Sequence, residues 1–404
     1  MDTMKNTFIA IFALLLFSAC SSTQVGDFKN WLASPSGAIA EQNFANRGLS
    51  KEECEEAARI VDSLWYETTA ERLGREWQEL VLTNDTLKLA CACRTFGPQP
   101  ADGRSLYISM HGGGECPKEV NDEQWMNQIY LYQPFEGVYV APRAPWNTSD
   151  LWHKEGLDEL LEKLIQACVV FEGINPDKVY LLGYSAGGDG VWRLAPRMAD
   201  KWAAASMMAG HPGEASQINL LNLPYMIWMG ENDHFYNRNI LAREKGEIMD
   251  SLANANPGHY IHQTNIIEGK GHWMDGVDAD ALSWMAQYRR EPYPTSIVWR
   301  QERVVREYFY WLSAPREELL QGKTVRTKIE DNTIDIEECD YSRLRIYIND
   351  EMADLDKKVT VRYKGEEIFS GKVERTITNL YSSLNARNDI RYSFPCIIEV
   401  DIEQ

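Results

Sequence analysis

The sequence predicts an α/β fold, in which a mostly parallel sheet is covered by helices on both faces and is followed by a small β-rich domain. Three observations indicate this class. Short β-rich runs alternate with helix-like segments from about residue 81 to residue 312. These runs are apolar at nearly every position, as in strands that are buried on both faces. Beyond residue 315 short alternating runs dominate.

The first residues are typical of an export signal. Lys5 precedes an apolar run at residues 8–17 that is too short to span a bilayer and ends at small residues before Cys20. Residues 17–20, Phe-Ser-Ala-Cys, resemble a bacterial lipobox, although phenylalanine replaces the usual leucine. We therefore expect residues 1–19 to be a signal peptide and Cys20 to carry lipid, which would anchor the protein in the periplasm or on the cell surface. A freely secreted protein with an ordinary Cys20 is the alternative.

Residues 20–49 are rich in Ser, Ala, Gly and Asn and show no period, which predicts a tether. Order is expected from residue 50, because Ser50 and Glu53 have the spacing of a capping box. Apolar residues follow at helical spacing as far as Trp77. The sequence thus predicts a helix over residues 50–80 that packs on the next domain.

Residues 81–312 form the predicted larger domain. Its expected strands lie at residues 106–110, 137–141, 179–182, 203–208, 225–229 and 261–267, after a strand-like stretch at 81–95. An amphipathic helix is expected between residues 157 and 171. Sheets of this kind place ligands at the carboxyl ends of their strands, so the loops after the strands are where a site is expected.

The chain changes character after a helix-like stretch at residues 302–312. Residues 313–323 are the predicted linker, and residues 324–404 are the predicted β-rich domain. The alternating runs of that domain lie at 324–328, 344–348, 359–363 and 396–402, with one helical segment near 380–386.

Composition sets further limits. The 404 residues include 41 basic and 60 acidic side chains, a net charge of −19, and 44% are hydrophobic, which is ample for a core. The acidic excess argues against a partner that is duplex nucleic acid or an anionic membrane surface; only a lipid anchor would hold the protein at a membrane. Apart from Cys20, seven cysteines have irregular spacing, which indicates neither a disulfide framework nor a zinc site.

A candidate nucleophile lies where the predicted strand at residues 179–182 ends. Gly183-Tyr184-Ser185-Ala186-Gly187 follows it and precedes a helix-like segment. In this Gly-x-Ser-x-Gly pattern, a sharp turn exposes the serine hydroxyl above the sheet, and small neighbours permit the strained backbone. The bare pattern arises by chance in roughly one chain in ten of this length, given ordinary glycine and serine usage. The prediction therefore depends on the strand that precedes the pattern and the helix-like segment that follows it.

A glycine-rich loop follows the predicted strand at residues 106–110. It reads His111-Gly112-Gly113-Gly114, and glycines let backbone amides approach a substrate closely. A tetrahedral intermediate needs such preorganised N–H donors for its oxyanion. We expect the amides of Gly113, Gly114 and Ala186 to form this oxyanion hole, with His111 bracing the loop; a tight glycine turn without that role is the alternative.

A serine nucleophile needs a base and an acid that orients the base. Asp233 follows the predicted strand at 225–229, and His272 lies in a glycine-flanked loop after the strand at 261–267. The order serine, acid, histidine is the one expected on this architecture. We therefore predict Ser185, Asp233 and His272 as the catalytic residues. The rival acids are Glu231, Asp275 and Asp278.

Four further side chains are candidates for substrate binding, because each follows a predicted strand or the candidate histidine. Aromatic rings can stack on sugars or aryl groups, although tryptophan packs in a core more often. These candidates are Trp146, Trp152, His211 and Trp273.

Together, His111-Gly112-Gly113-Gly114, the Ser185 motif, Asp233 and His272 resemble the α/β-hydrolase superfamily over roughly residues 81–312. The compact unit is most similar to its esterase and prolyl-oligopeptidase-like branch, which includes feruloyl, acetyl-xylan and polyhydroxybutyrate esterases. The resemblance implies an acyl-enzyme mechanism that needs no metal and no cofactor. Glu115-Cys116-Pro117 departs from lipase-like members, which often carry an apolar residue there, and this puts a lipid substrate in doubt.

Three functions remain open at this point. The leading hypothesis is a serine esterase acting on a carboxylic ester, either a small molecule or one linked to a glycan. A serine peptidase of the prolyl-oligopeptidase type is the second, although the N-terminal segment is too short for a propeller. An inactive hydrolase-fold protein that binds a surface ligand is the third.

Overall fold

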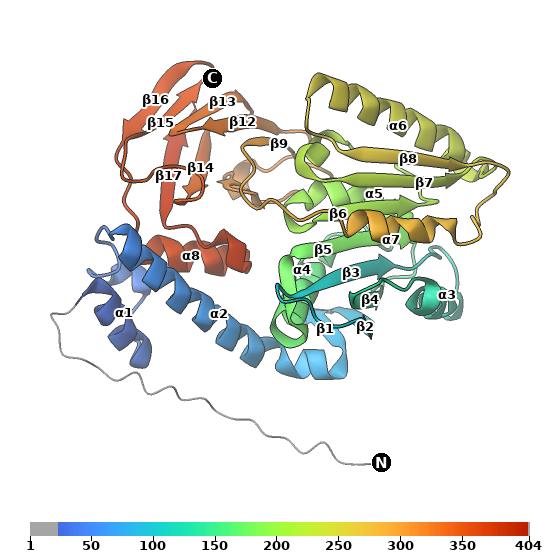
Figure 1. Ribbon diagram of the computed structural model, residues 1–404, viewed down its shortest axis with the longest axis horizontal. Coiled ribbons are helices and arrows are strands. Elements are labelled where there is room, and N and C mark those ends of the chain that lie inside the picture. The colour runs from blue at the N-terminus through green and yellow to red at the C-terminus, as the bar shows by residue number, and fades with distance from the viewer. Residues whose placement is uncertain (1–22, 403–404) are drawn as a thin grey trace, which may run out of the picture.

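The computed structural model describes residues 23–402 and has an eight-stranded sheet in the larger part of the molecule (Figure 1). Across the sheet the strand order is β1-β2-β4-β3-β5-β6-β7-β8. The five neighbouring pairs from β4 to β8 are parallel, whereas β1 with β2 and β2 with β4 are antiparallel. The strands are β1 (Val81–Asn84), β2 (Leu87–Phe96), β3 (Arg104–Met110), β4 (Gly137–Arg143), β5 (Ile174–Tyr184), β6 (Ala204–Met208), β7 (Tyr225–Gly230) and β8 (His262–Ile267).

Helices cover both faces of this sheet, because successive side chains of a strand point to opposite faces. In β3, Leu106 and Ile108 lie in the core that α4, α5 and α6 share, whereas Tyr107 lies in a second core with α3 and α7. The predicted α/β-hydrolase fold class is thereby confirmed. The helices are α3 (Lys118–Leu131), α4 (Leu157–Glu172), α5 (Ala186–Arg197), α6 (Arg238–Ala255) and α7 (Asp280–Met285).

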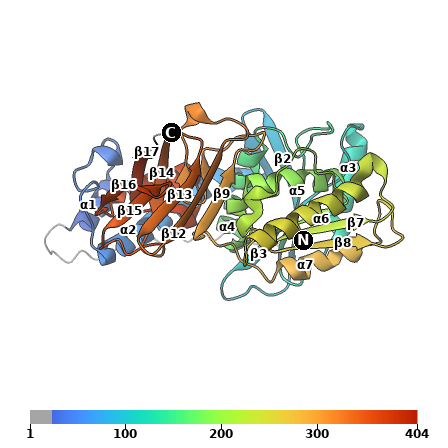
Figure 2. The same cartoon turned by 90° about the horizontal axis from the view of Figure 1, so that it is seen from above.

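The C-terminal part contains two smaller sheets, which lie beside the large sheet in both views (Figures 1 and 2). One has the order β16-β15-β13-β12-β9 and the other the order β10-β11-β14-β17. This agrees with the β-rich character predicted for residues 324–404. The elements are β9 (Ser296–Arg300), β10 (Tyr308–Phe309), β11 (Leu312–Ser313), β12 (Thr324–Glu330), β13 (Thr333–Cys339), β14 (Arg343–Ile348), β15 (Val359–Tyr363), β16 (Glu366–Gly371), α8 (Ile377–Arg387) and β17 (Cys396–Asp401).

A long helix, α2 (Lys51–Glu79), connects the two parts by packing on both α4 and α8 (Figure 1). The predicted capping box starts it: the Glu53 amide donates to the Ser50 hydroxyl over 3.2 Å, and the Ser50 amide donates to the Glu53 carboxylate over 2.9 Å. Near its C-terminal end, the Trp77 indole donates to Glu172 at the end of α4. The helix predicted over residues 50–80 is therefore present.

The predicted tether contains a helix, α1 (Gln24–Ala33), which corrects the expectation for that segment. Phe28 is fully buried and stacks on Trp31 at 6.4 Å between ring centroids. Lys29 also pairs with Glu56 of α2 at 2.6 Å. The apolar stripe is only two turns long, too short to show a period in the sequence, and tertiary packing stabilises it.

The helix predicted at residues 302–312 is absent, and this expectation was wrong. Phe309 to Leu312 are four consecutive residues, all at most 2% exposed, so they cannot lie on one face of a helix. They form instead the tight hairpin of β10 and β11, with Tyr310 at a φ of 48° in its turn. Upstream, β9 pairs with β12 and so belongs to a C-terminal sheet although it lies before residue 312.

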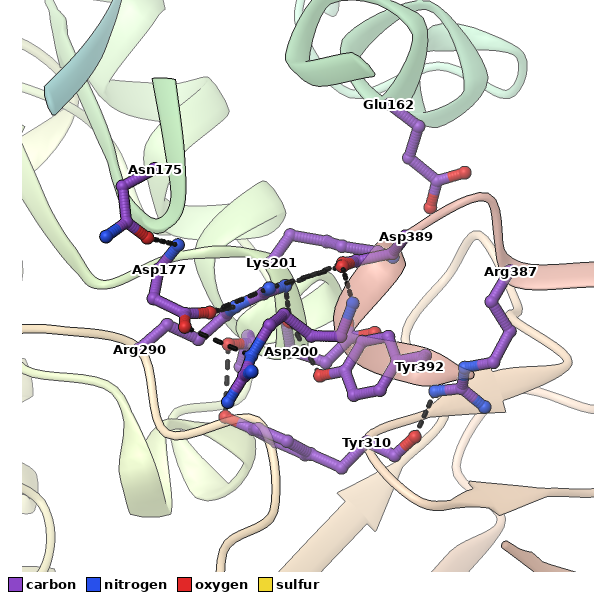
Figure 3. Close-up of polar contacts among 12 residues, drawn as sticks. Glu162, Asn175, Asp177, Asp200, Lys201, Arg290, Tyr310, Arg387, Asp389 and Tyr392 are labelled. Carbon is purple, nitrogen blue, oxygen red and sulfur yellow. Dashed lines mark hydrogen bonds and ion pairs between the residues drawn. The ribbon is translucent and has the colours of Figure 1, made fainter. Parts of the chain in front are cut away.

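Figure 3 shows a buried cluster of charged groups between the large sheet and the C-terminal part. The Arg290 guanidinium donates to Asp177 over 3.0 Å and to Asp389 over 2.7 Å, and Lys201 lies 3.4 Å from Asp389. Burial opposes ionisation of Asp389, but Arg290 and Lys201 outweigh it and hold the pKa of this carboxyl well below its usual range. We call these four residues the Arg290 cluster.

Some predictions concern residues that the structure does not describe. The signal peptide at residues 1–19 and the lipid attachment at Cys20 lie outside the described residues. Within residues 23–402, no helix has the length and apolar character needed to cross a membrane. The seven cysteines in this range are all free thiols.

Candidate active site

The candidate nucleophile stands on a sharp turn between β5 and α5. Ser185 has φ 57° and ψ −120°, a backbone conformation that costs energy and holds the hydroxyl above the end of the strand. Glycine is required at the flanking positions because a side chain there would clash with the backbone. A Cβ on Gly187 would lie 2.0 Å from the Met110 carbonyl oxygen, and one on Gly183 would lie 2.4 Å from the carbonyl oxygen of Gly187.

The structure brings the three predicted catalytic side chains into one hydrogen-bonded row. The Ser185 hydroxyl lies 2.8 Å from His272 Nε2, and His272 Nδ1 lies 2.7 Å from Asp233 Oδ2. The Asp233 side chain is fully buried, whereas the His272 side chain is 41% exposed. In the tautomer that fits this row, Nδ1–H donates to Asp233 and Nε2 accepts from the serine, so the imidazole is ready to take a proton.

The rival acids are engaged elsewhere. Glu231 accepts a hydrogen bond from the Gly269 amide, and Asp275 pairs with Lys270. Asp278 is fully buried and accepts from the Tyr132 hydroxyl; burial raises the pKa of this carboxyl. Among the candidate acids, only Asp233 touches His272 in the part of the chain that the structure describes.

Tyr184 positions the loop that carries His272, a role that the sequence did not reveal. Its hydroxyl donates to the His272 carbonyl oxygen over 2.7 Å and accepts from the Met274 amide over 3.1 Å. Burial raises the pKa of Tyr184, so the phenol remains protonated and able to donate. Because Tyr184 precedes the nucleophile, one side chain connects the serine turn to the histidine loop.

Asn121 of α3 organises the glycine loop, and this corrects one predicted oxyanion donor. The Gly114 amide donates to the Asn121 side-chain oxygen over 2.9 Å, while the Asn121 amide group donates back to the Gly114 carbonyl over 3.1 Å. Gly114 N–H is thus occupied and is not available to an oxyanion. Gly113 N–H has no acceptor among residues 23–402, and Ala186 opens α5, where N–H groups lack an intrahelical partner.

His111 braces the same loop from below, as expected. It is fully buried, and burial lowers the pKa of its imidazole to about 4, so the ring is neutral. Its Nδ1–H donates to the Gly112 carbonyl over 2.6 Å, and its Nε2 accepts from the Ala144 amide over 3.1 Å. The indole of Trp152 donates to the His111 carbonyl over 2.8 Å.

Ser185 and His272 line an open groove of about 780 Å³. Of the four predicted substrate-binding residues, Trp273 lines this groove. Trp152 is fully buried beneath the glycine loop, where it cannot contact a substrate. The groove is lined by Gly112, Gly113, Val120, Gln124, Met126, Asn127, Gln128, Tyr130, Leu131, Tyr184, Ser185, His272 and Trp273.

The other two predicted binding residues lie outside the groove lining. The Lys154 ammonium lies 5.3 Å from the centre of the Trp146 ring. The His211 amide donates to Asp189, and burial lowers the pKa of the His211 imidazole. The sequence also missed α3 as a groove wall, because its mixed polar and apolar residues show no clear period.

The structure within residues 23–402 contains no group of three or more His, Cys, Asp or Glu side chains arranged to hold a metal ion. The groups that converge on Ser185 are an imidazole, a carboxylate and backbone amides. This set can move a proton, form a covalent bond to a carbonyl carbon and stabilise an oxyanion.

Comparison with known proteins gives a likeness in structure alone. No family model and no curated protein sequence matches the chain. Solved structures that are similar include a thermostable esterase, with 17% identity over 52% of this chain and a TM-score of 0.38. Another is the fluorophosphonate-binding serine hydrolase FphF of Staphylococcus aureus, with 15% identity over 51% of this chain and a TM-score of 0.35. A putative dipeptidyl aminopeptidase IV from Bacteroides ovatus is also similar, with 12% identity over 52% of this chain and a TM-score of 0.36. The matches span 62%, 96% and 34% of those chains, respectively.

Proposed function

We propose that this protein is a serine hydrolase that cleaves a carboxylic ester linked to a carbohydrate, through an acyl-enzyme intermediate. One observation carries the proposed serine hydrolysis: the His272 ring joins the Ser185 hydroxyl and the buried Asp233 carboxylate at 2.8 and 2.7 Å, at the edge of an open groove. A solvated histidine with a structural role would not need a strained serine on one side and a buried carboxylate on the other.

In the first half of the reaction, Ser185 Oγ attacks the ester carbonyl carbon while His272 Nε2 takes the hydroxyl proton. The carbonyl oxygen becomes an oxyanion and accepts hydrogen bonds from the amides of Gly113 and Ala186. The tetrahedral intermediate then collapses, the bond to the alkoxy oxygen breaks, and His272 returns its proton to the departing alcohol.

In the second half, a water molecule replaces the alcohol. His272 Nε2 takes a proton from this water as its oxygen attacks the acyl carbon of the ester to Ser185. Collapse of the second intermediate releases the carboxylic acid, and the Ser185 oxygen regains its proton from His272. Each cycle thus consumes one ester and one water and restores the enzyme.

Asp233 acts on the ring and not on the substrate. It accepts from Nδ1–H, which keeps the tautomer whose Nε2 is basic, and its negative charge stabilises the imidazolium that forms in each half. Because the Asp233 side chain is buried, solvent screens this interaction little.

The proposal is tested by measuring hydrolysis of p-nitrophenyl acetate, methyl ferulate, acetylated xylan and a proline-containing peptide amide. We expect turnover of the esters, and a loss of roughly 10⁴-fold or more in kcat for Ser185→Ala, because the nucleophile is removed. Circular dichroism checks that the variant is folded. Cleavage of the peptide in preference to the esters would favour a peptidase, and absence of serine-dependent turnover would favour the inactive binding protein.

A further inference from the structure

One face of α3 forms a long wall of the groove. The lining residues of this helix recur at spacings of three and four, as residues on one helix face do. From Val120 to Leu131 the wall spans twelve residues, and the eleven steps between them are about 17 Å at the rise of an α-helix. This length exceeds what a small acyl group and a small alcohol occupy. The wall consists of Val120, Gln124, Asn127, Gln128 and Leu131, with Met126 and Tyr130 beside it.

The groove is free of charged side chains. None of the described residues that line it is Asp, Glu, Lys or Arg, although these types make up 25% of the chain. Glu119 and Glu123, which precede the lining residues Val120 and Gln124 in the sequence, are exposed, as is Lys118. An anionic chain would be repelled by the net charge of −19, and no Lys or Arg within residues 23–402 lines the groove to offset this; the Arg94 guanidinium lies outside the lining and faces the Tyr130 ring.

The groove offers neutral hydrogen-bonding groups beside the nucleophile. The carboxamides of Gln124 and Asn127 form no hydrogen bond within residues 23–402, and both line the groove. Gln124 also lies against the glycine loop, since its side-chain oxygen is 3.6 Å from the position of a Cβ on Gly112. A hydrocarbon chain laid along the wall would strip water from these amides without replacing it, which is unfavourable.

Two aromatic rings line the groove with part of their surface held by the protein and part exposed. Tyr130 is 63% exposed, and the Arg94 guanidinium lies 5.2 Å from its ring centre. Trp273 is 51% exposed and packs against Tyr184 at 5.7 Å between ring centroids. Because neighbouring side chains already fix these rings, they lose little conformational entropy when a ligand binds. Their flat apolar surface suits the C–H faces of sugar rings.

We infer that the groove binds an extended, uncharged glycan along α3, with Tyr130 and Trp273 as stacking surfaces and Gln124 and Asn127 as hydrogen-bonding partners of its hydroxyl groups. The inference rests on the proposed ester hydrolysis and narrows its substrate: the glycan carries the ester that reaches Ser185. Free carboxylates along the glycan exclude it from the groove.

Binding is tested without turnover, by affinity electrophoresis of the full chain carrying Ser185→Ala. Gels contain xylan, glucomannan or polygalacturonate. We expect at least one of the neutral polysaccharides to retard the protein and polygalacturonate to leave its mobility unchanged. Adding Tyr130→Ala or Trp273→Ala should raise the apparent Kd about five- to tenfold. Phe135→Ala is the matched control, because Phe135 is 94% exposed and does not line the groove.

Three results of the electrophoresis would overturn the inference: no retardation by either neutral polysaccharide, equal retardation by polygalacturonate, or retardation that is unchanged by both aromatic substitutions. A fourth contrary result would come from kinetics: a kcat/KM that rises with the acyl length of p-nitrophenyl esters and falls in Tyr130→Ala would indicate that the groove binds an acyl chain. Hydrolysis of p-nitrophenyl acetate by the unsubstituted protein is measured in parallel. If the protein hydrolyses the ester but does not bind a glycan, the glycan inference is wrong and the proposed hydrolysis stands. If it binds a glycan but shows no serine-dependent hydrolysis, the proposed function is wrong.

Discussion

The candidate triad and the Arg290 cluster both set a buried aspartate against a nitrogen group, but their surroundings differ. Asp233 faces an imidazole that is 41% exposed in an open groove, and its second carboxylate oxygen, although buried, has no hydrogen-bond partner within residues 23–402. Asp389 faces the basic groups of Arg290 and Lys201, whose side chains are 2% and 6% exposed. The first carboxylate therefore faces a group that takes up a proton in the proposed reaction, whereas the second faces two basic groups that take no part in it.

This difference separates a site that moves protons from one that holds two parts of a chain together. A carboxylate beside a neutral imidazole gains most when the ring becomes charged, which happens only during the reaction. A carboxylate between two basic groups has its partners in the ground state, so we expect the loss of a partner to affect folding and the contact between the large sheet and the C-terminal part (Figure 3).

The largest effect is expected for Asp233→Asn, which keeps the shape of the triad but removes its charge. The asparagine favours the wrong imidazole tautomer, so kcat should fall by roughly 10⁴-fold, as measured with p-nitrophenyl acetate. Stability should change far less than activity. Asp275→Asn is the control, since Asp275 pairs with Lys270 and does not touch His272. A similar loss in both variants, or a loss only in the control, would move the acid role away from Asp233.

The opposite pattern is expected for Arg290→Met. The substitution leaves Asp389 with Lys201 and Asp177 with Arg391 as their remaining cations, so it should lower the free energy of unfolding by up to about 3 kcal/mol. The folded fraction should keep its KM for p-nitrophenyl acetate. Urea unfolding followed by tryptophan fluorescence measures the first effect, and initial rates measure the second.

Arg345→Met provides the comparison for that experiment. Arg345 and Glu399 form an ion pair of 2.6 Å whose side chains are 54% and 41% exposed, so its removal should cost no more than about 1 kcal/mol. If the two variants lose the same stability, the Arg290 cluster does not hold the parts together.

The smallest effect concerns Glu302, a largely buried carboxyl that has no paired cation among the described residues. Burial raises its pKa from 4.5 to about 7, so the folded state prefers the protonated form. Its contribution to stability is fully present below about pH 4.5 and is lost as the pH rises through 7. Glu302→Gln should therefore gain stability relative to the parent between pH 5 and pH 8, on the order of 1 kcal/mol.

Urea unfolding of Glu302→Gln and its parent at both pH values measures this gain, with the exposed Glu330→Gln as control. The sign is opposite to that of Asp389, whose lowered pKa gives stability that is present at neutral pH and lost in acid. A stability difference that stays constant from pH 5 to pH 8 would show that Glu302 ionises freely.

The sequence predicted those features whose cause is local. Ser185 was found because a strained turn needs small neighbours within two residues, and His272 and Asp233 because they follow strands in a fixed order. The α2 helix was found from its capping box and its apolar spacing. Each of these signals is contained in a few consecutive residues.

The sequence could not predict features that depend on distant partners. Asn121 accepts from the Gly114 amide although it lies seven residues further along the chain, on a helix that the sequence did not identify as part of the site. Arg290 meets residues 113 and 99 positions away. The hairpin around Tyr310 was misassigned because four adjacent apolar residues are buried by tertiary packing, which no single period describes.

The most direct test of the account is covalent labelling of the folded protein with a fluorophosphonate, followed by intact mass and peptide mapping. We expect one adduct, located on Ser185, which is absent in Ser185→Ala. A folded protein that gains no adduct, or that gains one on another residue, would contradict the claim that Ser185 is an activated nucleophile.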